Sequence, residues 1–187
     1  MTLVPGRACG GCTVCCTELH INAPSLKKLA GVRCPNLRED CLCAIYETRP
    51  QTCSDFECGW RVMAALGDHW RPDRAGIVLI PKTKDNPPGY RANSGVQIML
   101  LGPGALDNAE LPGLVAQWVE ARVPLYLTVA APVGFLAPSA FLNEIVADAV
   151  RRKDRGALTA VLEGTVKALS LRKLERAETA GLPPAST

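Results

Sequence analysis

The chain has 187 residues, of which 48% are hydrophobic and 21% charged, and its formal net charge is +3. This composition is typical of a globular protein and excludes a disordered or fibrous chain. The longest apolar runs are much shorter than the roughly 20 residues that cross a bilayer, and the N-terminus lacks the apolar stretch of a secretory signal. We therefore expect a cytoplasmic protein with no membrane partner.

The cysteines are confined to the first 58 residues. They are Cys9, Cys12, Cys15, Cys16, Cys34, Cys41, Cys43, Cys53 and Cys58. Cytosolic reductants keep thiols reduced, which argues against a disulfide scaffold. Buried structural thiols also explain the pattern poorly, because four cysteines within eight residues, among Gly and Thr, form no apolar face. We predict that they ligate metal. Eight thiolates with two divalent ions would take the net charge to about −1, so no nucleic-acid partner is expected.

The spacing of the first cysteines indicates how they would bind metal. Cys9, Cys12 and Cys15 stand three apart, and two intervening residues allow a turn that brings successive sulfurs to one ion or cluster. Cys16 adjoins Cys15, and neighbouring side chains diverge, so these two thiolates should face different metals or different positions on a cluster. The five later cysteines can complete one or two four-ligand sets, and the spacing leaves their assignment open.

The segment between the two cysteine groups contains one predicted helix. Ser25 can cap a short helix over Leu26–Ala30, and Gly31 can end it. The rest of the segment is loop-like with few large apolar side chains. Metal ligation would therefore have to supply the stability of this part of the chain.

Near the last cysteines, Arg49 is a candidate cofactor-binding residue. Its guanidinium can donate to a cluster sulfur or offset thiolate charge, and Pro50 fixes the turn before Cys53. The alternative is a solvated arginine on a surface turn. Tyr46 and Trp60 are expected to shield the metal site or pack in the core.

The composition changes near Trp60, where apolar segments separated by Pro and Gly clusters begin. We predict a cysteine module over 1–60, an α+β lobe over 61–180 and a disordered tail over 181–187. The expected strands are Ile77–Ile80, Val96–Leu101 and Leu125–Ala130. The expected helices are a crossover helix at Leu111–Val123, one at Ala140–Arg152 capped by Ser139, and one at Leu158–Arg176. The fold class is therefore α+β: a loop-rich cysteine module docked on a small mixed α/β lobe with a helical C-terminal part.

The cysteine motifs resemble those of a known family. Cys9-Gly-Gly-Cys12-Thr-Val-Cys15-Cys16, then Cys34-Pro-Asn-Leu37, then Cys43-Ala-Ile-Tyr46-Glu-Thr-Arg49-Pro50-Gln-Thr-Cys53, is similar to the YkgJ-type CxxCxxCC family of zinc- or iron-chelating proteins. The resemblance covers about residues 9–60. It implies as ligands Cys9, Cys12, Cys15, Cys16, Cys34, Cys43 and Cys53, and it fixes Cys41 and Cys58 less tightly.

The metal and the function have alternatives. Three cysteines at two-residue spacing with remote partners suit iron–sulfur ligation, whereas separated pairs and Cys41-Leu-Cys43 suit zinc. The first hypothesis is a protein that stores, senses or delivers metal or electrons. The others are a metal-dependent enzyme with an open coordination position, and a structural metal module in an interaction protein whose partner is unknown. His20 and His69 are expected to be ordinary histidines.

Overall fold

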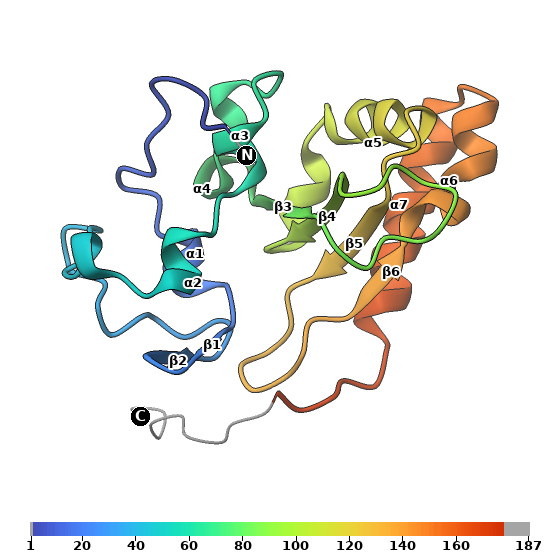
Figure 1. Ribbon diagram of the computed structural model, residues 1–187. Coiled ribbons are helices and arrows are strands. Elements are labelled where there is room, and N and C mark those ends of the chain that lie inside the picture. The colour runs from blue at the N-terminus through green and yellow to red at the C-terminus, as the bar shows by residue number, and fades with distance from the viewer. Residues whose placement is uncertain (1, 178–187) are drawn as a thin grey trace.

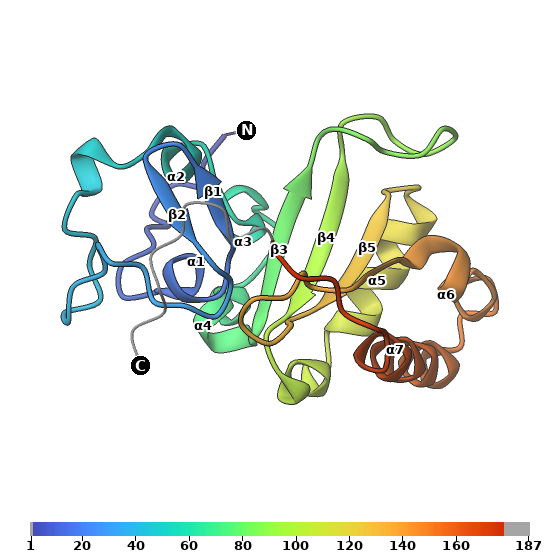
Figure 2. The same ribbon diagram turned by 90° about the horizontal axis from the view of Figure 1, so that it is seen from below.

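The computed structural model describes residues 2–177. The chain forms a cysteine-rich part and, beside it, a part built on a four-stranded sheet (Figures 1 and 2). The helices are α1 (Val14–Thr17), α2 (Gln51–Ser54), α3 (Gly59–Val62), α4 (Pro72–Ala75), α5 (Leu111–Glu120), α6 (Leu142–Arg151) and α7 (Arg155–Ser170). The strands are β1 (Ile21–Ala23), β2 (Leu26–Lys28), β3 (Ile77–Lys82), β4 (Gly95–Leu100), β5 (Leu125–Val129) and β6 (Ser139–Phe141). Single 3-10 turns are η1 (Tyr46–Thr48), η2 (Asp68–Trp70) and η3 (Pro103–Asp107). The tail expected over 181–187 lies outside the described residues.

The large sheet has the order β3-β4-β5-β6. Strands β3 and β4 are antiparallel, β4 and β5 are parallel, and β5 and β6 are antiparallel. A parallel pair of consecutive strands needs a crossover connection, and α5 supplies it, as the sequence predicts. The α+β fold class with a helical C-terminal part is confirmed.

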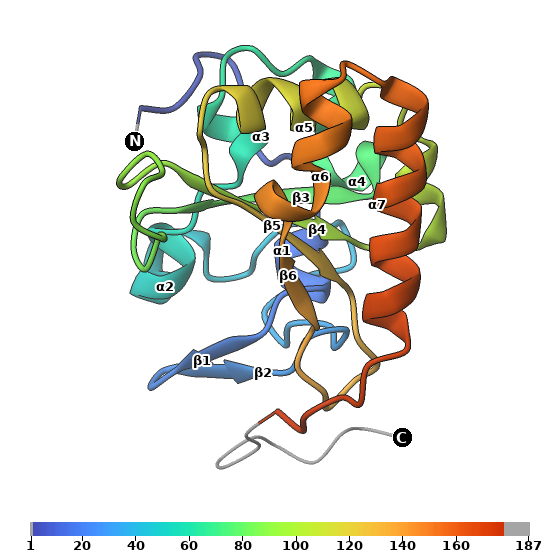
Figure 3. The ribbon, with the colours of Figure 1, turned by 90° about the vertical axis from the view of Figure 1, so that its right-hand side faces the viewer.

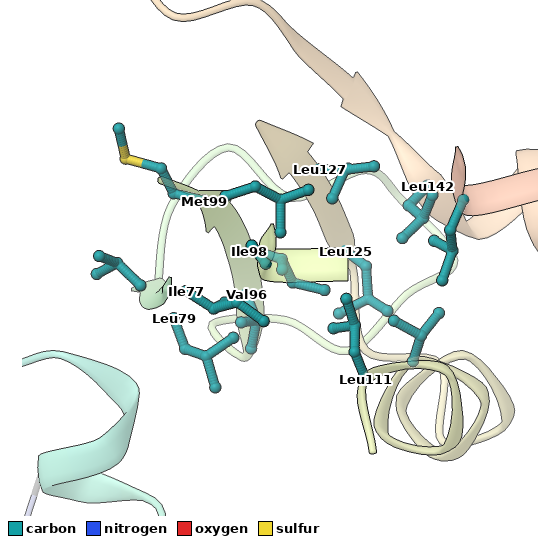
Figure 4. Close-up of a cluster of buried hydrophobic side chains, with 14 of the residues drawn as sticks. Ile77, Leu79, Val96, Ile98, Met99, Leu111, Leu125, Leu127 and Leu142 are labelled. Carbon is teal, nitrogen blue, oxygen red and sulfur yellow. The ribbon is translucent and has the colours of Figure 1, made fainter. Parts of the chain in front are cut away.

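One face of the sheet carries α5, α6 and α7, which Figure 3 shows packed together on the same side. Residues at alternate positions of the central strands point to this face, and the register aligns them across the sheet. Figure 4 shows Ile98, Leu125 and Leu127 near Leu111 of α5 and Leu142 of α6, all fully buried. This apolar layer is the main core.

Helix α6 begins later than predicted. Ser139 does not cap it, because Ser139–Phe141 forms the edge strand β6 and pairs with Tyr126–Thr128 of β5. The buried Asn143 then joins the first turn to the sheet. Its Oδ1 accepts a hydrogen bond from Leu125 N (2.7 Å), and its Nδ2 donates to Val123 O (2.8 Å). Helix α7 also differs from the expected bounds, and its N-terminus is capped by Asp154.

The short helix predicted over Leu26–Ala30 is wrong. Leu26–Lys28 is strand β2, which forms a hairpin with β1 in the register Ile21 with Lys28 and Ala23 with Leu26. Leu26 and Lys28 are both buried, while Lys27 between them is half-buried. This period of two suits a strand, and burial of alternate side chains outweighs the capping signal of Ser25.

The cysteine-rich part contacts the sheet through α3 and α4, which pack against β3. Val14, Cys58 and Trp60 belong to the same buried cluster as the strands of the large sheet. The two parts therefore share one core at their junction. Among residues 2–177, no helix has the length and apolar content needed to cross a bilayer.

Candidate metal centre

The first three cysteines lie on a turn that leads into α1. Cys12 N donates to Cys9 O (2.9 Å), and Gly10 adopts the positive φ of 52° that this turn requires. Helix α1 then carries Cys15 and Cys16 on successive positions. Successive residues of a helix point about 100° apart, so the two thiols face different surroundings.

Cys15 faces Cys9, Cys12 and Cys58. We call these four cysteines the core-side set. Burial raises the pKa of the Cys15 thiol well above its ordinary value, and the charges of nearby cysteines, led by Cys58, Cys9 and Cys12, raise it further. The pKa of Cys58 is likewise raised by burial and by the charges of Cys9 and Cys12. Cys9, Cys12 and Cys58 therefore lie close enough to Cys15 to act on it electrostatically, and the charge of Cys16 raises the pKa of Cys15 as well.

Cys16 faces Cys34, Cys43 and Cys53. We call these four cysteines the hairpin-side set. Burial raises the pKa of Cys16 to about 11, with further contributions from the charges of Cys34, Cys43 and Cys53. Cys34 N donates to Cys16 O (2.8 Å), which ties the two segments together. Cys16, Cys34 and Cys53 also pack with Leu26 and Leu37 in a separate apolar cluster. A backbone bridge between Leu37 and Cys43 brings the remaining thiol into this region.

Cys41 stands outside both sets. It is exposed, its φ is 65°, and its Sγ lies 3.9 Å from the carbonyl oxygen of Glu39 in its own turn. The resemblance to the CxxCxxCC family fixes neither Cys41 nor Cys58 tightly as a ligand. In the structure the two differ, because Cys58 is buried with the core-side set and Cys41 is exposed.

The donor chemistry of the two sets fits zinc or an iron–sulfur cluster. All nine cysteines are free thiols, and four thiolates complete a structural zinc site or hold a cluster. Over residues 2–177, no group of three or more His, Cys, Asp or Glu side chains stands in an arrangement that could hold a metal ion. The thiols of each set therefore act on one another electrostatically but do not stand in the arrangement of a metal site.

A buried lysine that the sequence did not single out lies beside the hairpin-side set. Lys28 is only 2% exposed, and its Nζ donates to the carbonyl oxygens of Thr17 (2.9 Å), Leu29 (2.9 Å) and Val32 (2.8 Å). Burial lowers its pKa, while the nearby charges of Cys34 and Cys16 act to raise it. A buried cation needs a compensating anion, and Glu18 acts on Lys28 beside the two cysteines of this set.

Arginines anchor the core-side set. Arg7 donates to the carbonyl oxygens of Trp60, Met63 (3.0 Å) and Leu66, which holds the segment before Cys9 against α3 and thus near Cys58. Arg61 donates from Nη1 to Cys9 Sγ (3.5 Å) and lies 3.1 Å from Glu57 Oε2. No local signal marks Arg7, because its partners are more than 50 residues away in the chain.

Arg49, the predicted cofactor-binding residue, stacks on Tyr46, with 4.1 Å from its guanidinium carbon to the ring centroid. Its charge acts to lower the pKa of Cys53, although burial and the charges of Cys34 and Cys43 raise that pKa overall. Arg49 therefore lies near the hairpin-side set. His69 Nε2 is 2.8 Å from Glu110 Oε2, and His20 is an exposed residue beyond α1.

No protein-family model, curated protein or solved structure matches the chain. The resemblance to the CxxCxxCC family therefore stays a prediction.

Proposed function

We propose that this protein binds metal at two centres, each held by four cysteine thiolates. The core-side set would use Cys9, Cys12, Cys15 and Cys58, and the hairpin-side set would use Cys16, Cys34, Cys43 and Cys53. The occupant of each is zinc or an iron–sulfur cluster. The proposed role is storage, sensing or delivery of metal or electrons in the cytoplasm.

The observation that carries this proposal is that the adjacent residues Cys15 and Cys16 have different cysteine neighbours. Cys58, Cys9 and Cys12 act most on the pKa of Cys15, and Cys34, Cys43 and Cys53 act on that of Cys16. Two apolar clusters divide several of the same cysteines in the same way, with Cys58 and Cys12 in one and Cys34, Cys16 and Cys53 in the other. Four is the ligand number of structural zinc and of common clusters.

Charge gives a second support. Four thiolates around one Zn²⁺ carry a net charge of about −2. Lys28 and Arg49 lie by the hairpin-side set, and Arg61 contacts the core-side set, so each proposed centre has a cation beside it. Glu18 supplies one carboxylate near the buried Lys28, and metal-bound thiolates of Cys34 and Cys16 would add permanent negative charge beside it.

The test is metal analysis of the full chain after anaerobic purification. We expect either two zinc ions per chain, or iron with an equal amount of acid-labile sulfide and a visible absorption band. Cys15→Ser and Cys16→Ser should each lose the metal of one centre and keep that of the other. The matched control Cys41→Ser should keep both.

Two results would overturn the proposal. The first is a chain without tightly bound metal when it is expressed with zinc and iron present. The second is an equal loss of all metal in Cys15→Ser and Cys16→Ser with folded protein, which would mean that the two thiols serve one centre.

A further inference from the structure

A cavity of about 270 Å³ lies between the cysteine-rich part and the face of the sheet opposite the helices. Figure 3 shows α5–α7 on one side of the sheet, with α1 and the β1–β2 hairpin toward the other. The cavity is mostly apolar, with Leu19, Phe56, Met99 and Phe135 among its lining residues. At about 270 Å³ it lies just below the roughly 300 Å³ at which small-molecule sites begin, so only a small ligand of one or two rings would fit.

The floor of the cavity follows the strand register. One row of paired residues crosses the sheet from β3 to β6 on this face. It consists of Ile80, Gln97, Tyr126 and Phe141, each paired with the next. Ile80 and Gln97 line the cavity, and Tyr126 and Phe141 pack beside them with ring centroids 5.4 Å apart. The row therefore places one amide within an apolar and aromatic surface.

The hydrogen bonds around Gln97 among the described residues use only one N–H of its amide. Thr128 Oγ1 donates to Ser139 Oγ (3.1 Å), so it must accept from Gln97, whose Nε2 donates to it at 3.0 Å. The amide keeps one N–H and the carbonyl oxygen Oε1, and no described residue bonds to Oε1. A free donor beside a free acceptor can pair with a ligand edge that offers the same two groups in reverse.

The walls of the cavity come from segments fixed by the proposed metal ligands. Glu18, Leu19 and His20 begin two residues after Cys16, and Phe56 lies between Cys53 and Cys58. The opposite wall, Phe135–Ala137, is held by hydrogen bonds from Leu136 N to Glu175 O (2.8 Å) and from Ala177 N to Gly134 O (2.9 Å). Loss of metal should therefore displace one wall and leave the other in place.

We propose that this cavity binds a planar heteroaromatic molecule that presents a hydrogen-bond donor next to an acceptor, as a nucleobase or cyclic amide does, and that Gln97 recognises that edge. The apolar floor and Phe56 bury the ring faces, and the Gln97 amide selects for the paired polar edge. The inference rests on the proposed function for one point only, which is that bound metal orders the wall at Glu18–His20 and Phe56.

The experiment measures binding of two probes to the metal-loaded chain by saturation-transfer NMR titration. Adenine offers the donor–acceptor edge, and indole has similar size but a single N–H donor and no acceptor. We expect adenine to bind more tightly than indole. Gln97→Leu should weaken adenine about tenfold, because the polar edge then faces an apolar wall, and should leave indole unchanged.

Two further variants sharpen the result. Ala137→Trp fills the cavity from the β5–β6 loop and should abolish binding of both probes. Gln117→Leu makes the same change on the exposed side of α5 and should alter neither. The inference is overturned if metal-loaded protein binds neither probe, or if Gln97→Leu and Gln117→Leu bind adenine equally.

Metal content measured on the same samples separates this inference from the proposed function. Adenine binding that depends on Gln97 in a chain without metal would support recognition by Gln97, and it would reject both the two metal centres and the ordering of the cavity wall by metal. Full metal content without Gln97-dependent binding of adenine would support the two metal centres and reject the proposed ligand site. Chelation of the loaded chain should weaken both probes, since both touch the wall that the cysteines hold.

Discussion

Lys28 shows how a single residue depends on its surroundings at this site. Its side chain is 2% exposed, yet its amine has three carbonyl acceptors and lies by the thiols of Cys16 and Cys34. An ammonium group is costly to bury unless its hydrogen bonds are made and its charge is balanced. Three carbonyls satisfy the first need, and Glu18 together with metal-bound thiolates would satisfy the second.

The first prediction replaces this charge with a side chain of similar length. Lys28→Met should destabilise the metal-loaded chain by about 1–3 kcal/mol, because three part-buried carbonyls lose their donor. It should also speed the loss of metal from the hairpin-side set, because the countercharge is gone. Chemical denaturation and a competition assay with a zinc chelator measure the two effects.

Lys84→Met, an exposed change of the same kind, supplies the comparison and should alter the free energy of unfolding by less than about 0.5 kcal/mol. If Lys28→Met matched Lys84→Met in stability and in metal release, the buried lysine would have no part in the centre.

At the scale of elements, α3 brings Cys58 to the core because a glycine lets it approach β3 closely. A Cβ on Gly59 would lie 2.6 Å from Leu79 Cβ, and Leu79 is fully buried. A contact this short cannot be relieved by a flexible side-chain end. Helix α7 provides the contrast, since a Cβ on Gly164 would meet no atom within 4 Å.

The second prediction compares the same substitution in these two helices. Gly59→Ala should destabilise the chain by about 1–3 kcal/mol, because α3 must move away from the sheet. Gly164→Ala should stabilise it by about 0.5–1 kcal/mol, because alanine has the higher helix propensity. Thermal and urea unfolding measure both. Equal effects of the two changes would mean that α3 does not depend on the close approach at Gly59.

The third prediction concerns the contact between η2 and the start of α5. Trp70 Nε1 donates to Glu110 Oε2 (2.8 Å), and His69 Nε2 lies at the same distance. The hydrogen bonds to His69 and Trp70 lower the pKa of Glu110 below its ordinary 4.5. A lowered pKa gives stability that is present above pH 4.5 and is lost as the pH falls through the folded-state value.

The measurement is the difference in melting temperature between the wild type and Glu110→Gln over a range of pH. We expect the wild type to be more stable above pH 4.5 and the difference to shrink below it. Glu163→Gln, on the exposed side of α7, should show no such trend. If the difference in melting temperature grew as the pH fell, the ionised carboxylate of Glu110 would not be the form that His69 and Trp70 stabilise.

At the scale of the molecule, the two parts differ in what orders them. The sheet and α5–α7 have an extensive apolar core, whereas the separate cluster in the cysteine-rich part has only three buried members, Leu26, Cys34 and Leu37. So small a cluster buries little apolar surface. Apart from Val14, Cys58 and Trp60, which pack in the main core, this part has little apolar support, and the proposed metal ligation would add to its stability.

The fourth prediction follows from this contrast. Chelation of the metal-loaded chain should remove hydrogen-exchange protection from residues 9–58 and leave β4, β5 and α7 protected. Exchange measured by mass spectrometry resolves the two regions. Full protection of 9–58 in the metal-free chain would show that metal does not order it. Loss of protection in both regions would show that the junction through Trp60 and Val14 makes the molecule one cooperative unit.

The sequence by itself determined the elements whose signal is local. The apolar runs at Ile77–Ile80, Val96–Leu101 and Leu125–Ala130 are the three strands β3, β4 and β5, and the periodic segment at Leu111–Val123 is the crossover helix α5. It also identified the clustered cysteines as the candidate site. These segments could be recognised because a buried strand or helix repeats its apolar residues at the period of that structure.

The tertiary structure decided what depends on distant partners. The hairpin β1–β2 and the edge strand β6 form because neighbours cover Leu26 and Lys28 and pair with Ser139–Phe141, which outweighs the capping signals of Ser25 and Ser139. The division of the thiols between Cys15 and Cys16, the contacts of Arg7 and the burial of Lys28 likewise join segments far apart in the chain. No window of sequence contains both partners of such contacts, because only chain folding brings them together.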